Sequence, residues 1–63
     1  MLVLVFSEED KEKLIKYNQG FICVQKFGDI EGYLFECDAH FNFAENDIKY
    51  VISNRITFWE GVN

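Results

Sequence analysis

The chain has 63 residues, which suffice for one small domain over 1–63 and predict no second one. Hydrophobic residues make up 49% of it and aromatic residues 17%, which excludes an intrinsically disordered chain. Eleven acidic residues against six basic ones give a net charge of −5, and the lysine cluster Lys11, Lys13 and Lys16 is interspersed with acids. Because direct binding of DNA or RNA needs clustered cations, the composition argues against it.

The sequence predicts a cytoplasmic protein that does not enter a membrane. Its longest apolar run, Met1 to Phe6, is far shorter than the ~20 residues that span a bilayer. No basic segment precedes this run and no small-residue cleavage site follows it, as a secretory signal would require. The two cysteines, Cys23 and Cys37, are therefore expected to be free thiols.

The first two predicted elements are a strand and a helix. Residues 2–6 are an uninterrupted apolar run, typical of a strand that is central in its sheet or covered on both faces. Ser7 is suited to a helix N-cap, and the three acids that follow it are favoured by the positive end of the helix dipole. Gly20 is suited to the C′ position just beyond a helix. We predict a helix over 8–19.

The middle of the chain predicts a β-hairpin. Residues 21–27 and 33–38 are rich in β-forming residues, and the segment 28–32 between them begins and ends with glycine. A loop placed symmetrically over these five residues would set Cys23 opposite Cys37. The two thiols would then share the apolar side of the hairpin.

The segment 42–53 carries two signals that disagree. Asn42 and Glu45 have the spacing of an N-cap and its reaching carboxylate, and apolar residues follow at helical spacing. The β-branched run 48–52 is also typical of a strand. We favour a helix over 42–53, followed by a last strand over 55–60.

The predicted order of elements is β-α-β-β-α-β, which is an α+β fold. It is the ferredoxin-like, split-βαβ arrangement, with the helices on one face of the sheet and the other face left to water or a partner. If 42–53 is not helical, the alternative is a βαβ unit followed by two β-hairpins. Neither arrangement implies a function by itself.

Cys23, Cys37 and His40 are the only cysteines and the only histidine of the chain. Structural zinc usually takes four ligands, and Asp38, the nearest fourth ligand, would point to the opposite side of the strand from Cys37. A Cys–His nucleophile pair would need an orienting group and an oxyanion site, and no motif supplies them. We therefore predict no metal, no cofactor and no catalytic residue, and interpret the cysteines as small buried side chains.

Three pairs of acids recur at a spacing of two residues in the second half of the chain, where all the excess negative charge lies. They are Asp29 and Glu31, Glu36 and Asp38, and Glu45 and Asp47. A rigid array of carboxylates can imitate the phosphates of a nucleic acid and occupy a basic site on another protein. The alternative interpretation is a solvated surface that keeps the protein soluble. Calcium binding and acid–base catalysis lack the ligand ladder and the cleft that they need.

Aromatic residues are the second signal of an interface, because they are enriched at binding hot spots. Trp59 would lie on the uncovered face of the sheet, in the predicted last strand. We therefore predict a small acidic, non-enzymatic module that binds and regulates another protein. Its sharpest form is an inhibitor that mimics nucleic acid at a basic site, as small proteins of phages and mobile elements do.

Two other hypotheses remain open from the sequence. One is a homodimer that associates through the uncovered face or an edge strand, for which the small core of so short a chain is an argument. The other, with less support, is a metal or thiol protein that uses the two cysteines and the histidine.

Overall fold

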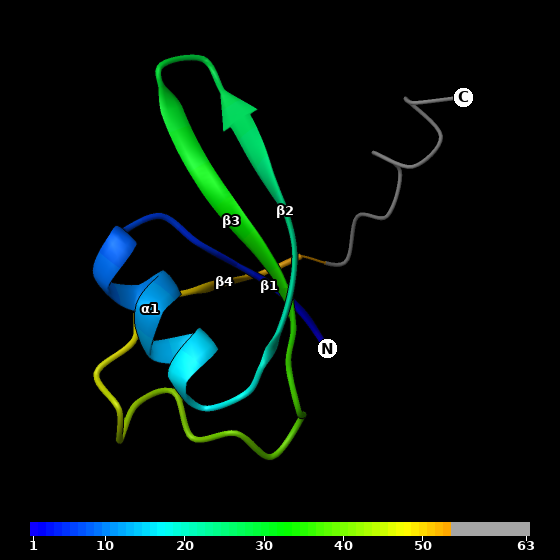
Figure 1. The fold of residues 1–63 in the computed structure, drawn as a ribbon, viewed down its shortest axis with the longest axis vertical. Coiled ribbons are helices and arrows are strands. Elements are labelled where there is room, and N and C mark those ends of the chain that lie inside the picture. The colour runs from blue at the N-terminus through cyan, green and yellow to red at the C-terminus, as the bar shows by residue number, and fades with distance from the viewer. Residues whose placement is uncertain (54–63) are drawn as a thin grey trace.

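The computed structural model describes residues 1–53, and residues 54–63 lie outside the described part. The elements in chain order are β1 (Leu2–Val5), α1 (Glu8–Lys16), β2 (Gly20–Phe27), β3 (Ile30–Glu36) and β4 (Val51–Ile52). The strands form one antiparallel sheet in the order β2-β3-β1-β4 (Figure 1). The fold belongs to the α+β class, as the sequence predicts. It has one helix within residues 1–53, so the two-helix ferredoxin-like arrangement is not confirmed.

The helix α1 begins at the predicted residue and ends three residues before the predicted end. Ser7 is its N-cap, and the Ser7 hydroxyl oxygen accepts the Asp10 backbone N–H at 3.0 Å. Asn18, rather than Gly20, takes the left-handed conformation that closes the helix, at a φ of 64°. Asparagine tolerates this conformation better than most residues, so the helix closes before the glycine is reached. Gly20 instead begins β2.

The prediction of a helix over 42–53 is wrong. Its N-cap does form, because Asn42 Oδ1 accepts the Glu45 backbone N–H at 2.9 Å. One turn later Asp47 takes a left-handed φ of 55°, and its N–H bonds back to the Ala44 carbonyl at 3.1 Å, as at a helix C-terminus. The β-branched residues that follow leave the turn and lead into β4. The predicted last strand over 55–60 lies outside the described residues.

The predicted register of the hairpin is also wrong. A two-residue turn at 28–29 closes it, and Gly28 has the φ of +68° that the first position of a type II′ turn requires. Such a turn suits the natural twist of two paired strands better than a five-residue loop does. Cys23 consequently pairs with Leu34 and not with Cys37. The shift is an odd number of residues, so it places the two thiols on opposite faces of the sheet.

The core lies between one face of the sheet and the two segments that cover it, α1 and the irregular segment 37–50. Figure 1 shows the irregular segment running from β3 past α1 to β4. The buried residues of this core are Val3, Val5, Leu14, Tyr33, Phe35, Cys37, Phe43 and Ile48. The Phe43 ring stacks on Tyr50 with centroids 4.0 Å apart. The irregular segment therefore fills the space that the predicted second helix would have occupied.

Candidate functional site

The face of the sheet opposite this core, which we call the second face, is almost free of charge. Strand pairing assigns to it the following residues: Leu2, Leu4, Cys23, Gln25, Phe27, Ile30, Gly32, Leu34, Glu36 and Val51, with Phe6 continuing the alternation beyond β1. Glu36 is the only charged residue among these eleven. Leu4 and Leu34 at its centre are buried, whereas Phe27 and Ile30, which flank the hairpin turn, are exposed.

Three exposed side chains, Phe6, Phe27 and Ile30, form what we call the aromatic cluster at the hairpin end of the second face. The rings of Phe6 and Phe27 meet edge to face, with centroids 6.1 Å apart, and Ile30 pairs with Phe27 across the hairpin. Both rings lie over Gly32, where a Cβ would approach Phe6 Cε1 to 3.0 Å and Phe27 Cε2 to 3.2 Å. The glycine therefore leaves room for both rings. Their relative exposures are 44% for Phe6, 48% for Phe27 and 58% for Ile30.

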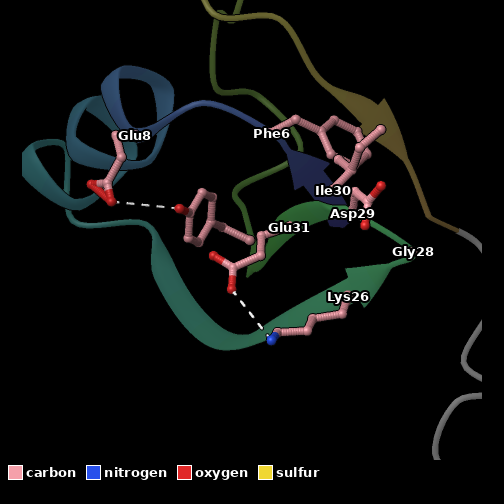
Figure 2. Close-up of a pocket in the computed structure, with 8 residues that line it drawn as sticks. Phe6, Glu8, Lys26, Gly28, Asp29, Ile30 and Glu31 are labelled. Carbon is pink, nitrogen blue, oxygen red and sulfur yellow. Dashed lines mark hydrogen bonds and ion pairs between the residues drawn. The ribbon is translucent and has the colours of Figure 1, made fainter.

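An open groove of about 600 Å³ lies beside the aromatic cluster (Figure 2). It shares two residues with the cluster, Phe6 and Ile30. Its other lining residues are Glu8, Lys26, Gly28, Asp29, Glu31 and Tyr33. Three carboxylates and one ammonium group give this lining a formal charge of −3 + 1 = −2. Two of the predicted acids, Asp29 and Glu31, are thus placed together next to exposed apolar side chains.

Tyr33 lines this groove with its side chain largely buried. Its hydroxyl donates to Glu8 Oε2 at 3.5 Å, and Lys11 Nζ lies 5.0 Å from the centre of its ring. Burial raises the pKa of Tyr33, and the nearby carboxylates of Glu8 and Glu31 raise it further, so the phenol stays protonated and remains a donor. The Lys26 ammonium lies 4.0 Å from Glu31 Oε2 (Figure 2). Carboxylates beside aromatic rings are the chemistry that accepts a lysine or arginine side chain.

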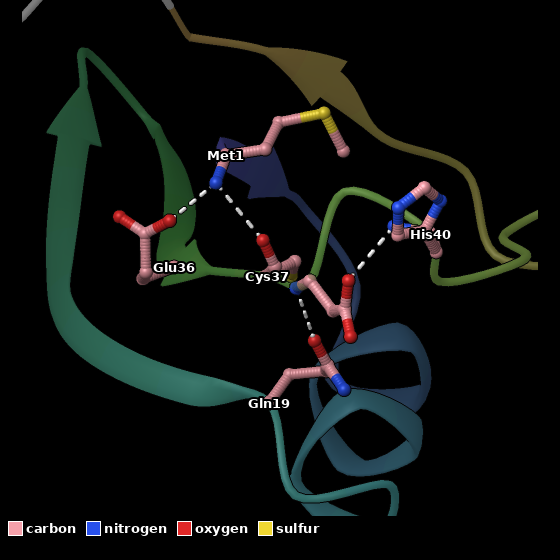
Figure 3. Close-up of polar contacts among 6 residues, drawn as sticks. Met1, Gln19, Glu36, Cys37 and His40 are labelled. Atoms are coloured by element: carbon pink, nitrogen blue, oxygen red, sulfur yellow. Dashed lines mark hydrogen bonds and ion pairs between the residues drawn. The ribbon is translucent and has the colours of Figure 1, made fainter.

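The second predicted pair of acids, Glu36 and Asp38, lies at the other end of β3 (Figure 3). The Met1 ammonium forms an ion pair with Glu36 and donates to the Cys37 carbonyl at 2.9 Å. Asp38 Oδ1 accepts the His40 backbone N–H at 2.9 Å. At ~3.3 Å per residue, roughly 17 Å of strand separate Glu36 from Glu31 in the groove.

The third pair, Glu45 and Asp47, lies in the irregular segment. Lys13 reaches this turn from α1, and its ammonium donates to the carbonyl oxygens of Asn46 and Asp47 at 3.3 Å each. All six predicted acids of the three pairs are exposed. The structure therefore brings Asp29 and Glu31 together in one groove and places the three pairs at three separate positions. Trp59, the predicted anchor, lies outside the described residues.

The structure separates the three soft ligands that the sequence analysis considered for a metal. Cys37 is buried in the core, Cys23 lies half-buried on the second face, and His40 is exposed. Among residues 1–53, no group of three or more histidine, cysteine, aspartate or glutamate side chains is arranged to hold a metal ion.

The two thiols are expected to differ in reactivity. Burial raises the pKa of Cys37 from 9.0 to about 11, and the neighbouring N-terminal ammonium opposes only part of this shift. Since the thiolate is the reactive form, Cys23 should be alkylated at pH 8 in the folded protein, and Cys37 only after denaturation. Mass spectrometry after iodoacetamide treatment measures both, and equal labelling of the two cysteines in the folded protein would contradict this placement.

The raised pKa also predicts a pH dependence of stability. Because the folded state holds the Cys37 proton more tightly than the unfolded state, the stabilisation is complete below pH 9 and is lost as the pH rises toward 11. Denaturation by urea should therefore show a larger loss of unfolding free energy over this range in the native protein than in Cys37→Ala. Parallel pH curves for the two proteins would show that Cys37 is not the cause.

The sequence alone does not group Phe6, Phe27 and Ile30 into one cluster. Phe6 and Phe27 are far apart in the chain, and only the correct register brings them together over Gly32. The available signal was the Gly28-Asp29 dipeptide, which resembles a two-residue hairpin turn and would have predicted that register.

Comparison with known proteins adds no relative. No family model matches the chain, and no curated protein or solved structure is significantly similar to it. Within the described residues, α1 is the only helix, and it is neither long nor apolar enough to cross a bilayer.

Proposed function

We propose that this protein is a non-enzymatic interaction module that binds and regulates another protein through the aromatic cluster. The observation that carries the proposal is the half-exposed state of Phe6, Phe27 and Ile30, of which the two rings meet edge to face over Gly32. Ordered, exposed apolar side chains on a small domain are typical of a protein-binding surface. Their order means that little conformational entropy is lost when a partner docks.

The charge around the cluster indicates the chemistry of the partner. The adjoining groove has a lining charge of −2, and the chain as a whole has a net charge of −5. A complementary surface would place an apolar side chain on the cluster and a lysine or arginine in the groove beside Glu8, Asp29 and Glu31. The proposed partner is therefore a protein with an apolar patch bordered by basic residues.

Mimicry of nucleic acid remains a sharper form of the same proposal. It would use the predicted acids as substitutes for phosphates at a basic site. Because the three acidic pairs lie at separate positions, they support contact through one pair more than mimicry by all three. We favour the pair in the groove, because it adjoins the aromatic cluster.

Two further parts of the proposal concern the fold and the cellular location. The strand order β2-β3-β1-β4, with α1 linking two strands that flank a third, supports a reduced ferredoxin-like fold in which the irregular segment replaces the second helix. The cytoplasm is the proposed location, because the expected free thiols suit a reducing compartment.

The test compares two charge insertions of the same kind. Ile30→Glu places a carboxylate within the aromatic cluster, whereas Ile15→Glu does so on α1, at a residue that is 45% exposed. Tagged versions of both proteins and of the native protein are used to capture partners from the lysate of the native host, with quantification by mass spectrometry. Melting curves establish that both variants fold.

Loss of a hot-spot contact weakens binding about 30-fold, so a true partner should be captured by the native protein and by Ile15→Glu but not by Ile30→Glu. A set of captured proteins that is unchanged by Ile30→Glu would refute docking at the cluster. Added duplex DNA distinguishes the sharper form. Displacement of the partner by DNA supports mimicry. If DNA displaces the partner and Ile30→Glu does not weaken its binding, the binding site is electrostatic and not the apolar cluster.

A further inference from the structure

The strand β2 forms one edge of the sheet, and within residues 1–53 no strand lies beyond it. It is eight residues long, contains no proline and carries one charge, that of Lys26. Soluble proteins usually protect an edge of this length with prolines, several charges or a covering segment, because its backbone groups are a template for another strand. The β2 edge has one such protection, a bulge between Phe21 and Cys23.

The turn of the hairpin determines which backbone groups of β2 point outward. In a two-residue hairpin the residues that flank the turn, here Phe27 and Ile30, exchange both backbone hydrogen bonds. Since the direction alternates along a strand, Val24 and Lys26 direct their N–H and C=O groups away from β3. The regular run that is free of the bulge is Cys23–Phe27.

We propose that two copies of this chain pair antiparallel along Cys23–Phe27, in a register centred on Gln25. This register places Val24 opposite Lys26 of the second copy, and Gln25 opposite its own equivalent. The outward groups of Val24 and Lys26 then form four backbone hydrogen bonds across the two-fold axis. The result is a continuous sheet through both copies, to which residues 1–53 of each copy contribute four strands, with the two aromatic clusters on the same side.

A second copy can occupy this edge without setting like charges opposite each other. The register that we propose sets each lysine opposite a valine, whereas a shift by one residue in the direction of the turn would set Lys26 opposite Lys26, which is unfavourable. The run itself has a charge of +1, so the excess negative charge of the chain lies away from the seam. Val24 and Phe27, which are about half-exposed, gain neighbours across it.

The seam is small compared with the ~800 Å² per partner of a standard interface, which predicts a weak dimer that dissociates in the micromolar range. The proposal does not require the proposed function, although Phe27 belongs both to the aromatic cluster and to the end of the paired run.

The experiment is sedimentation equilibrium of the native protein, Val24→Pro and Val24→Thr, over roughly 5 to 500 µM. Proline at this position removes the outward N–H but no hydrogen bond to β3. Threonine keeps the N–H and the β-branched shape. We expect the native protein and Val24→Thr to associate with rising concentration, and Val24→Pro to remain monomeric. A native protein that is monomeric throughout, or a Val24→Pro that associates as the native protein does, would overturn the proposal.

A cross-link tests the register and does not depend on the folding of Val24→Pro. In the proposed register, residue 25 of one copy faces residue 25 of the other as a non-hydrogen-bonded pair, with Cα atoms ~4.5 Å apart. Gln25→Cys in a Cys23→Ser background therefore permits a disulfide between the two copies. Lys26→Cys in the same background is the matched control, because its equivalents would lie beyond the ~7 Å that a disulfide can bridge. Oxidation should give a covalent dimer with Gln25→Cys alone. Equal cross-linking of both variants, or of neither, would refute the register.

Discussion

Phe35→Ala is expected to unfold a large part of the protein at room temperature. Phe35 is fully buried near the end of β3, where it pairs with Val3 on one side and Phe21 on the other. Truncation of a buried phenylalanine costs ~3–5 kcal/mol. A chain of 63 residues has a total stability of roughly 3–9 kcal/mol, so this loss is of the same size as the whole. Urea denaturation followed by circular dichroism measures it directly.

Phe27→Ala is the matched control for this prediction. It removes the same side chain from a position that is 48% exposed, where the ring contacts Phe6 and not the core. The expected cost is about 1 kcal/mol, which reflects the lost aromatic contact and half of the burial. If the two variants were destabilised equally, the division of the sheet into a core face and a second face would be incorrect.

The capping residues in the sequence predict correctly where two helical turns begin. Ser7 and Asn42 both accept the backbone N–H three residues later, as their spacing predicts. The same signals could not predict where each helical turn ends. Asn18 and Asp47 end the two segments by taking a left-handed conformation, which these residue types adopt less readily than glycine but more readily than most others. Tertiary packing decides which of these residues takes the left-handed conformation, and the local sequence encodes this only weakly.

The second face shows how a single error in register propagates. The alternation of apolar residues in the hairpin was recognised correctly, but the loop was placed over 28–32 instead of 28–29. An odd shift moved Cys23 to the face of Leu34 and gave Phe27 the neighbours Phe6 and Gly32. The candidate site therefore cannot be assembled from the sequence, which predicts a binding role for only two of the residues that line the groove, Asp29 and Glu31.

The acidic residues illustrate the limit of arguments from spacing alone. A separation of two residues places both members of a pair on one side of a strand, and Asp29 and Glu31 do line one groove. Distance between pairs depends instead on topology, which carries Glu36 to the far end of β3 and Asp47 into the irregular segment. To form one continuous charged surface, the three pairs would have to be brought together by the packing of distant elements. The local sequence does not specify that packing.

The irregular segment is expected to contribute as much stability as a helix would in its place. Phe43 is buried, with its ring 4.0 Å from Tyr50 and 4.9 Å from Phe41 in centroid distance. Phe43→Ala should therefore cost ~3–5 kcal/mol, as expected for a ring at the centre of a core, and should unfold the protein to an extent similar to Phe35→Ala. Urea denaturation of both variants under the same conditions makes the comparison.

A second substitution distinguishes the observed turn from the predicted helix over 42–53. Asp47 has a φ of 55°, where glycine is free of steric cost, so Asp47→Gly should leave the stability unchanged or raise it by a few tenths of a kcal/mol. In the interior of a helix over 42–53 the same change would lower stability by ~1 kcal/mol. The sign of the measured change decides between the two structures, because a turn that ends at Asp47 can gain from glycine and a continuous helix cannot.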